Sequence, residues 1–255
     1  MDLITNHTWI QSLKARAEKA IALRDDIEPA KFECNICEDK GFLENEHGEI
    51  GFCQCRKIKE AKERVEKSGI AHRLNENTFK SYKQDNESRA TAVSTCLKYL
   101  NDFKENQPTL ILMGEVGSGK THLAIATANK LLSKYVVKYV MYEEIRELRF
   151  CMNDREYYNN KISNLRDVQV LFIDDLFKGL EKNIDIAKAK TELDIVYEIV
   201  NYRYNNKKPM IITTELDINR MMQIDKALAS RILEMAKGYR VTFEGLELNY
   251  RIFGD

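Results

Sequence analysis

The hydrophobic pattern changes character near residue 90, after which short apolar runs alternate with stretches of helical period. The apolar runs predict strands at Thr109–Met113, Val136–Tyr142, Val168–Ile173, Met210–Thr213 and Val241–Phe243. The helical stretches between them predict helices at 121–134, 143–164, 188–205 and 225–237. Strands that alternate with helices are typical of a parallel sheet with helices on both faces. We therefore expect an α/β fold.

The first ninety residues follow a different pattern. Apolar residues recur at helical spacing in 8–24, which predicts an amphipathic helix. Residues 56–67 are charged with alternating sign, which is typical of a solvent-exposed helix. We expect this second helix to connect an N-terminal domain of residues 1–68 with a larger domain of residues 69–255. Residues 70–90 are polar and predict a loop.

Charge and hydropathy narrow the possible partners. The chain has 255 residues, with 40 Lys and Arg against 40 Asp and Glu, so its formal net charge is zero. The balance is also local, because residues 1–107 hold 18 basic and 19 acidic side chains and the rest hold 22 and 21. Contact with nucleic acid would therefore depend on a local patch. No apolar run approaches the ~20 residues of a membrane span, and the N-terminus lacks the pattern of a signal peptide. We expect a cytoplasmic protein.

Four of the six cysteines fall within 22 residues. They are arranged as C-x2-C, then fifteen residues, then C-x-C, at Cys34, Cys37, Cys53 and Cys55. The intervening segment contains three glycines and predicts a hairpin that returns the second pair to the first. Four thiolates in two close pairs suit a tetrahedral Zn²⁺ site. The alternatives are four unligated thiols, an iron–sulfur cluster, or a site in which His47 replaces one thiolate. Cys96 and Cys151 are expected on helices, as small apolar groups.

A phosphate-binding motif follows the first predicted strand. The residues are Gly114, Glu115, Val116, Gly117, Ser118, Gly119, Lys120 and Thr121, which fit G-x4-G-K-[ST] between an apolar run and a helical run. Backbone N–H groups of such a loop bind phosphates, Lys120 would reach the β- and γ-phosphates, and the Thr121 hydroxyl would ligate Mg²⁺. We assign residues 114–122 to the nucleotide site. Glu115 and Val116 have no expected side-chain role, and the ring of His122 is expected on the helix surface.

Two adjacent carboxylates end the third predicted strand. Asp174 and Asp175 follow an apolar run, and Asp174 comes 54 residues after Lys120. In a P-loop fold, Asp174 would hold the Mg²⁺ shell, and Asp175 would orient or deprotonate the attacking water. A strand that simply ends in a polar turn is the alternative. The pairing with the phosphate-binding loop favours the catalytic interpretation.

Together with these motifs, the segments KPMIITTEL, ASRILEMA, VTFEG and NYR resemble the AAA+ ATPases of the DnaC/DnaI type, which are bacterial and phage loaders of the replicative DNA helicase. The resemblance covers about residues 70–255, and the cysteine segment is similar to the zinc-binding segment of many such loaders. It implies an AAA+ fold without a full C-terminal lid, ATP hydrolysis with Mg²⁺, and assembly into a spiral or ring. It also implies helicase binding through the N-terminal region and contact of the ATPase part with single-stranded DNA.

The resemblance also implies roles for single residues. Arg231 matches the arginine finger, which would project into the site of a neighbouring subunit. Thr214 would be the polar sensor that positions water, with Glu215 as the alternative. Arg251 stands where a second arginine sensor would be. Arg203 matches a recurring basic position whose role the sequence does not define.

Other functions compete with a helicase loader. An ATPase partner of a transposase, as in the related IstB group, shares the ATPase core but usually lacks the four-cysteine segment. A small-molecule kinase would share the phosphate-binding loop, and a zinc adaptor would need no intact ATPase motifs. Candidate DNA contacts are Lys178, Lys182, Lys188, Lys190, Tyr202, Tyr204, Lys207 and Lys208. Each of them also fits an ordinary solvated lysine or a packed tyrosine.

Overall fold

The structure, a computed structural model, describes residues 34, 36–44, 50–106, 108–180 and 186–253. The chain divides into two compact units, Met1–Lys59 and Glu60–Asp255, with the division inside helix α2 (Gln54–Ser68). The end of α2 belongs to the larger unit, where the Arg64 guanidinium donates hydrogen bonds to the Leu132 and Ser133 carbonyls. The functional boundary after residue 68 stays a prediction. The helix expected at 8–24 lies outside the described residues.

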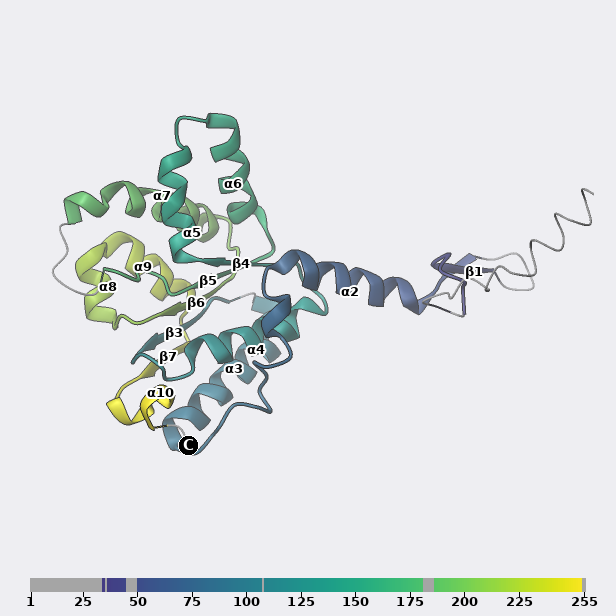
Figure 1. The fold of residues 1–255 in the computed structure, drawn as a ribbon, viewed down its shortest axis with the longest axis horizontal. Coiled ribbons are helices and arrows are strands. Elements are labelled where there is room, and N and C mark those ends of the chain that lie inside the picture. Colours follow the sequence, from purple (N-terminus) through teal and green to yellow (C-terminus); the bar gives the residue numbers. More distant parts are fainter. Residues whose placement is uncertain (1–33, 35, 45–49, 107, 181–185, 254–255) are drawn as a thin grey trace, which may run out of the picture. The chain divides into compact units, whose positions relative to one another are not determined.

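A five-stranded parallel sheet forms the centre of the larger unit, in the order β4-β5-β6-β3-β7 (Figure 1). Its strands are β3 (Leu110–Gly114), β4 (Val137–Met141), β5 (Val170–Asp174), β6 (Met210–Thr214) and β7 (Arg240–Phe243). All five predicted strands are present, within a few residues of the expected ends. The α/β class is confirmed. Because parallel strands end at one edge of the sheet, the termini of β3 and β5 are brought together there.

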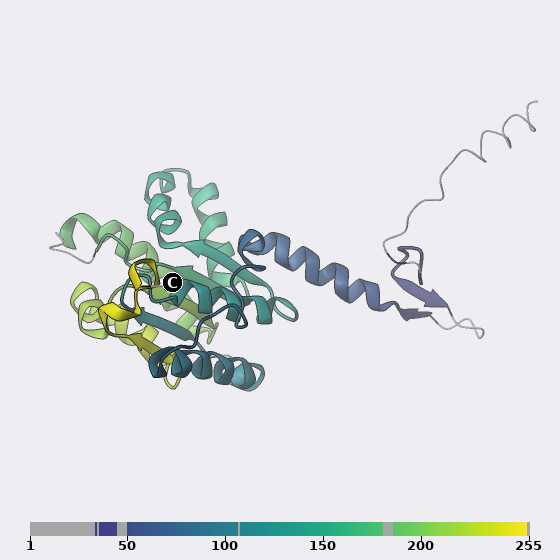
Figure 2. The same ribbon diagram turned by 60° about the horizontal axis from the view of Figure 1, so that its bottom comes forward.

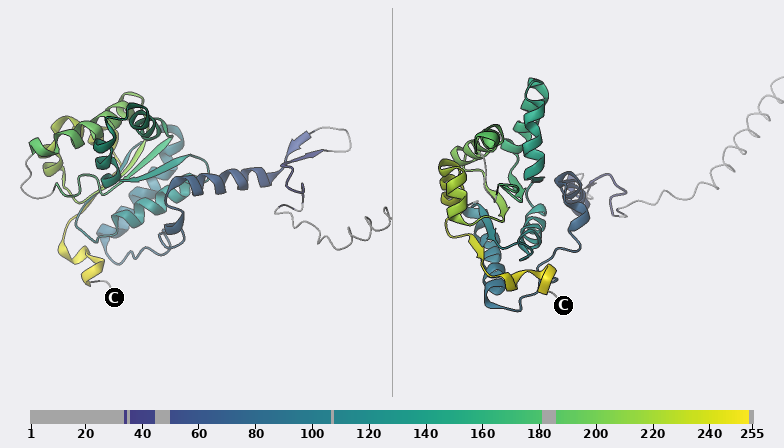
Figure 3. Two further views of the ribbon diagram at one scale, coloured as in Figure 1. Left: turned by 45° about the horizontal axis from the view of Figure 1, so that its top comes forward. Right: turned by 60° about the vertical axis from the view of Figure 1, so that its left-hand side comes forward.

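Alternate residues of each strand pack in two separate hydrophobic cores. In β5, Val170 and Phe172 belong to one core, and Leu171 and Ile173 belong to the other. The first core includes α3 (Glu87–Asn106) and α4 (Lys120–Leu132), whereas the second includes α5 (Tyr142–Glu147), α6 (Arg155–Asp167), α7 (Ile186–Asn205), α8 (Ile218–Ile224) and α9 (Lys226–Met235). Helices therefore cover both faces of the sheet (Figure 3).

The helices differ from the prediction where short polar side chains cap their ends. The single helix expected at 143–164 is interrupted after a 3-10 turn at Leu148–Cys151, and α6 begins where the Asp154 carboxylate accepts a hydrogen bond from the Tyr157 N–H at 3.0 Å. Helix α8 was not predicted. Asp217 caps its start, and Asp225 ends it and caps α9. Aspartate at an N-cap satisfies N–H groups that a new helix leaves unpaired.

The C-terminal segment lies against the phosphate-binding loop. It comprises a 3-10 turn at Leu246–Leu248 and the short helix α10 (Tyr250–Phe253), drawn in yellow in Figure 2. The Tyr250 N–H donates to the Gly117 carbonyl at 3.0 Å. None of the helices in the described part of the chain is long and apolar enough to cross a membrane.

Candidate nucleotide site and cysteine cluster

The phosphate-binding loop joins β3 to α4, as the motif predicts, and its glycines are required by its shape. Gly114, Gly117 and Gly119 all have positive φ, of 103°, 71° and 91°. A Cβ atom on Gly114 would lie 2.2 Å from the carbonyl oxygen of Phe243, and one on Gly119 would lie 2.7 Å from the ring of Tyr82. Side chains at these positions would therefore both strain the backbone and collide with neighbours.

Lys120 begins α4 and is almost fully buried. Its Nζ donates to the Gly114 carbonyl at 2.9 Å and to the Glu115 carbonyl at 2.6 Å, so the ammonium group lies along the loop. Burial lowers the pKa of Lys120, while the negative charges of Glu215 and Asp175 act in the opposite direction. The ammonium group is thus held against the backbone of the loop that is expected to bind phosphate.

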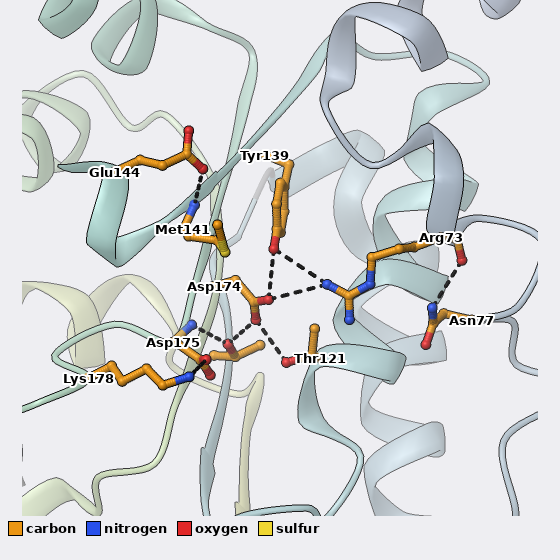
Figure 4. Close-up of polar contacts among 10 residues, drawn as sticks. Arg73, Asn77, Thr121, Tyr139, Met141, Glu144, Asp174, Asp175 and Lys178 are labelled. Atoms are coloured by element: carbon orange, nitrogen blue, oxygen red, sulfur yellow. Dashed lines mark hydrogen bonds and ion pairs between the residues drawn. The ribbon is translucent and has the colours of Figure 1, made fainter. Parts of the chain in front are cut away.

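Asp174 is the centre of a polar cluster at the end of β5 (Figure 4), and its side chain is 6% exposed. Its Oδ1 accepts hydrogen bonds from the Thr121 hydroxyl at 2.9 Å and from the Thr213 hydroxyl at 2.6 Å. Its Oδ2 accepts from the Tyr139 hydroxyl at 3.0 Å and lies 3.7 Å from Arg73 Nη1. The hydroxyl and carboxylate expected to share Mg²⁺ are therefore adjacent, and both are oxygen ligands of the type Mg²⁺ prefers.

Asp175 takes a strained backbone conformation, with φ of 55°. Its N–H donates to the Thr213 hydroxyl at 2.8 Å, and its Oδ2 accepts from Lys178 Nζ at 2.6 Å. That hydrogen bond raises the pKa of Lys178. Backbone strain of this kind concentrates at functional sites.

The structure places Thr213, rather than Thr214, at the site. Thr213 bonds to Asp174, whereas the Thr214 hydroxyl is buried and donates to the Leu176 carbonyl at 2.7 Å. Successive side chains of a strand point to opposite faces, so these two threonines cannot share a role. Thr214 therefore lacks the position expected of a sensor. Glu215, the alternative, is near enough for its charge to raise the pKa of Lys120.

Two further residues assigned to the nucleotide site have other contacts. One ring nitrogen of His122, Nε2, lies 2.8 Å from the Thr78 carbonyl oxygen, and the ring packs edge-on against Tyr82, so His122 holds the 70–90 segment. Arg251 is exposed on α10, and its backbone N–H donates to the Asn249 side chain at 3.0 Å.

Arg231 and Arg203 lie in different environments. Arg231 on α9 is partly exposed, donates to the Ala227 carbonyl at 2.9 Å, and lies over the rings of Tyr197 and Tyr204. Arg203 on α7 is fully buried. It donates to five carbonyls, those of Leu165, Arg166, Val168, Gln169 and Pro209. Burial lowers the pKa of Arg203 to about 10. Arg203 therefore ties the connection before β5 to the start of β6, a structural role that the sequence did not reveal.

The four clustered cysteines meet in the smaller unit. Strands β1 (Phe42–Glu44) and β2 (Ile50–Phe52) pair antiparallel as a hairpin, as the glycine pattern predicts. The four Sγ atoms, of Cys34, Cys37, Cys53 and Cys55, all lie within 4.8 Å of one another. A tetrahedron with Zn–S bonds of about 2.3 Å has edges of about 3.8 Å, and the Cys34 and Cys53 sulfurs are 3.8 Å apart. No disulfide joins any of the six cysteines. The arrangement fits a zinc ion and suggests metal binding.

Backbone N–H groups prepare this cluster for negative charge. The Gly41 N–H points to Cys37 Sγ at 3.3 Å. The N–H groups of Cys37 and Ile36 lower the pKa of Cys34 to about 7, whereas the hydrogen bond with Cys37 raises the pKa of Cys55. Thiolates are the form that binds metal. His47, the alternative ligand, lies outside the described residues.

Several candidate DNA contacts are engaged within the chain. The Tyr202 hydroxyl donates to Asp167, and the Tyr204 hydroxyl donates to Glu234. Lys208 donates to the Asp167 carbonyl at 2.9 Å. Lys182 and the side chain of Lys188 lie outside the described part. Tyr202 and Lys208 therefore meet at one residue, Asp167.

The fold and the site together define a P-loop ATPase of the AAA+ class. A family model described as IstB-like ATP binding protein matches residues 51–238. The chain belongs to this family. Phage-like element PBSX protein XkdC of Bacillus subtilis (strain 168) is 31% identical over 240 residues, which cover 90% of each chain. Replicative helicase loader DnaC of Escherichia coli (strain K12) is 27% identical over 175 residues, which cover 66% of each chain.

Solved structures agree on the fold. The crystal structure of the DnaC helicase loader matches with a TM-score of 0.57 at 23% identity, over 68% of this chain and 99% of that one. The replication initiator DnaA bound to AMPPCP and single-stranded DNA matches with a TM-score of 0.55 at 19% identity, over 68% and 51%. The chain is thus an ATPase of the IstB/DnaC type that shares the fold of these solved proteins, and the expected resemblance is confirmed.

Proposed function

We propose that this protein is an ATP-dependent loader of the replicative DNA helicase. The observation that carries the proposal is the phosphate-binding loop beside Asp174, where the Thr121 hydroxyl lies 2.9 Å from the carboxylate, in a chain related to proteins named replicative helicase loaders. The N-terminal unit would bind the hexameric helicase, and an oligomer of the ATPase unit would bind single-stranded DNA. The related phage-like element protein fits a phage or prophage origin.

The site residues suggest how nucleotide is bound and cleaved. N–H groups of residues 114–121 and the N-terminus of α4 would bind the phosphates, and Lys120 would turn from its two carbonyl partners to the β- and γ-phosphates. Thr121 and Asp174 would hold Mg²⁺, which neutralises charge on the phosphates. Asp175 would orient the attacking water once released from Lys178. Thr213, which contacts both aspartates, is the better placed threonine for a sensor.

Hydrolysis would be completed by a second copy of the chain. In the single chain, the Arg231 guanidinium donates to the Ala227 carbonyl of its own helix and lies over the rings of Tyr197 and Tyr204. The residue is partly exposed, and its buried Nε has no hydrogen-bond partner within the described part of the chain. We propose that Arg231 enters the site of the neighbouring subunit and stabilises charge that develops on the transferred phosphoryl group.

The smaller unit offers a surface that suits a protein partner. Ile36, Ile50 and Phe52 are 73%, 69% and 77% exposed around the cysteine cluster. Large exposed apolar side chains favour protein contact, and the absence of net charge favours a protein rather than DNA as the main partner. These residues support helicase binding through the metal-held hairpin.

The test is a loading assay with the host's replicative helicase and closed circular single-stranded DNA. We expect the wild type with ATP to transfer the helicase to the circle. Lys120→Ala should still bind the helicase but fail to transfer it, because one charge-assisted phosphate contact is worth roughly tenfold to hundredfold in affinity. Lys130→Ala, at the exposed opposite end of α4, is the matched control. Normal transfer by Lys120→Ala would contradict the proposal.

A second candidate is an ATPase partner of a transposase, because the matching family model is described as IstB-like. That match begins at residue 51 and so leaves out Cys34 and Cys37. Co-purification with a transposase, and no binding to the helicase, would favour this candidate.

A further inference from the structure

Arg73 lies outside every motif of the nucleotide site and yet reaches its central carboxylate (Figure 4). It ends the 3-10 turn at Ala71–Arg73, in the connection between α2 and α3. Its Nη1 lies 3.7 Å from Asp174 Oδ2 and donates to the Tyr139 hydroxyl at 3.4 Å. The Tyr139 hydroxyl donates to the same Oδ2 at 3.0 Å. One oxygen of Asp174 therefore faces a cation and a phenol, while the other faces two threonines.

The backbone of Arg73 is held by hydrogen bonds, whereas its side chain is partly exposed. The Arg73 N–H donates to the carbonyl of Ile70, a residue with no exposed surface. The Arg73 carbonyl accepts hydrogen bonds from both the N–H and the side-chain amide of Asn77, each at 3.0 Å. The Arg73 side chain is 31% exposed, so the guanidinium is able to swing into solvent without disturbing this anchor.

A guanidinium at this place opposes a second cation at the same carboxylate. Mg²⁺ takes carboxylate and hydroxyl oxygens in a strict octahedral arrangement, and two positive charges within a few ångströms repel each other. We propose that Arg73 is a positioning residue that competes with Mg²⁺ for Asp174 and sets the Mg²⁺ concentration at which the nucleotide site fills. Affinity for Mg²⁺ is then a property of the connection after α2 as well as of the phosphate-binding loop. This inference rests on the proposed metal role of Asp174.

The test is a Mg²⁺ titration of fluorescent N-methylanthraniloyl-ADP binding to the full chain. Removing a partly exposed arginine from a carboxylate should lower the half-saturating Mg²⁺ concentration of Arg73→Ala roughly threefold to tenfold. Arg73→Lys, which keeps the charge, should lie between Arg73→Ala and the wild type. Binding of the labelled ADP in EDTA should be the same in all three. A purely structural role would lower the melting temperature and leave the Mg²⁺ midpoint unchanged.

Two further variants distinguish an effect at Asp174 from a general folding defect. Arg64→Ala removes hydrogen bonds of the same segment to the end of α4 without touching Asp174, and its midpoint should equal that of the wild type. Tyr139→Phe keeps the ring and removes the other group on Oδ2, and its midpoint should also fall.

Each adverse result has a distinct meaning. If the half-saturating Mg²⁺ concentration of Arg73→Ala equals or exceeds that of the wild type, this inference is overturned, but the proposed function is not affected. Weaker binding of the labelled ADP by Arg73→Ala in EDTA also overturns it, because Arg73 would then contact nucleotide. Binding by the wild type that does not depend on Mg²⁺ overturns the metal role of Asp174 and this inference with it.

Discussion

The fold of each compact unit is stabilised in a different way. In the larger unit, both faces of a five-stranded sheet are covered by helices, and the strands β3, β5 and β6 are almost wholly buried. In the described part of the smaller unit, the strands have three residues each, and the buried apolar residues are Cys37 and Cys53. Among the residues of this unit that the structure describes, the buried core is thus formed by two cysteines of the cluster. We therefore expect metal binding to stabilise the smaller unit and hydrophobic packing to stabilise the larger one.

The largest expected effect comes from metal removal. We expect one zinc ion for each chain, and we expect a strong chelator to unfold the smaller unit, because structural zinc contributes on the order of 10 kcal/mol to such segments. The main thermal transition, which belongs to the larger unit, should stay where it was. Zinc release measured with a chromogenic chelator, together with calorimetry, checks this. Cys37→Ser should reproduce the effect of the chelator, whereas Cys151→Ser, outside the cluster, should not. If the purified protein contains no metal, the smaller unit is not stabilised by zinc.

The next effect concerns hydrolysis in the larger unit. Arg231→Ala should bind ATP normally and lose hydrolysis by roughly a thousandfold or more, the usual value of an arginine finger. Lys226→Ala, an exposed cation on the same helix, should hydrolyse ATP at the normal rate. Steady-state ATPase rates across a range of protein concentrations measure both variants. Hydrolysis at the wild-type rate by Arg231→Ala would exclude a site shared between subunits.

A smaller effect tests the packing of the larger unit. Arg203→Met should lower the free energy of unfolding by on the order of 3 kcal/mol, because several buried carbonyls lose their donor. For a unit of this size, that loss lowers the melting temperature by about 6 to 12 °C. Arg155→Met, on the exposed face of α6, is the control. An unchanged melting temperature would mean that the carbonyl contacts of Arg203 do not stabilise the fold, and zinc content should be unaffected in either case.

The sequence predicted the elements whose pattern is local. The five strands, the cysteine hairpin and the phosphate-binding loop are each defined by consecutive residues, and the structure contains all of them. The loop from Gly114 to Thr121 is an example. Its backbone conformation requires glycines at fixed positions, so the sequence motif is enough to predict the shape of the loop. Helix α8 was missed because its seven residues are too few for a clear period, although Asp217 and Asp225 were available as cap signals.

Contacts between distant segments were harder to predict. The sensor role of Thr214 stays a prediction, and the register that pairs Ile173 with Ile212 places Thr213, its neighbour in sequence, beside Asp174. Arg73 and Tyr139 gave no sequence signal, because one lies in a polar connection and the other in an edge strand, and only the fold brings them to the same carboxylate. Arg203 was noticed only as a recurring basic residue, and its five carbonyl partners come from segments that the chain folds together.

We propose that the metal-held unit recognises the helicase, while the ATPase unit binds nucleotide. The most direct measurement is a pull-down of the host's replicative helicase by the full chain, made beside a titration of fluorescent ADP on the same samples. Cys37→Ser should lose binding to the helicase and keep its affinity for nucleotide, whereas Cys151→Ser should keep both. Capture of the helicase by Cys37→Ser at the wild-type level, or loss of nucleotide affinity by a variant that remains folded, would contradict the proposal.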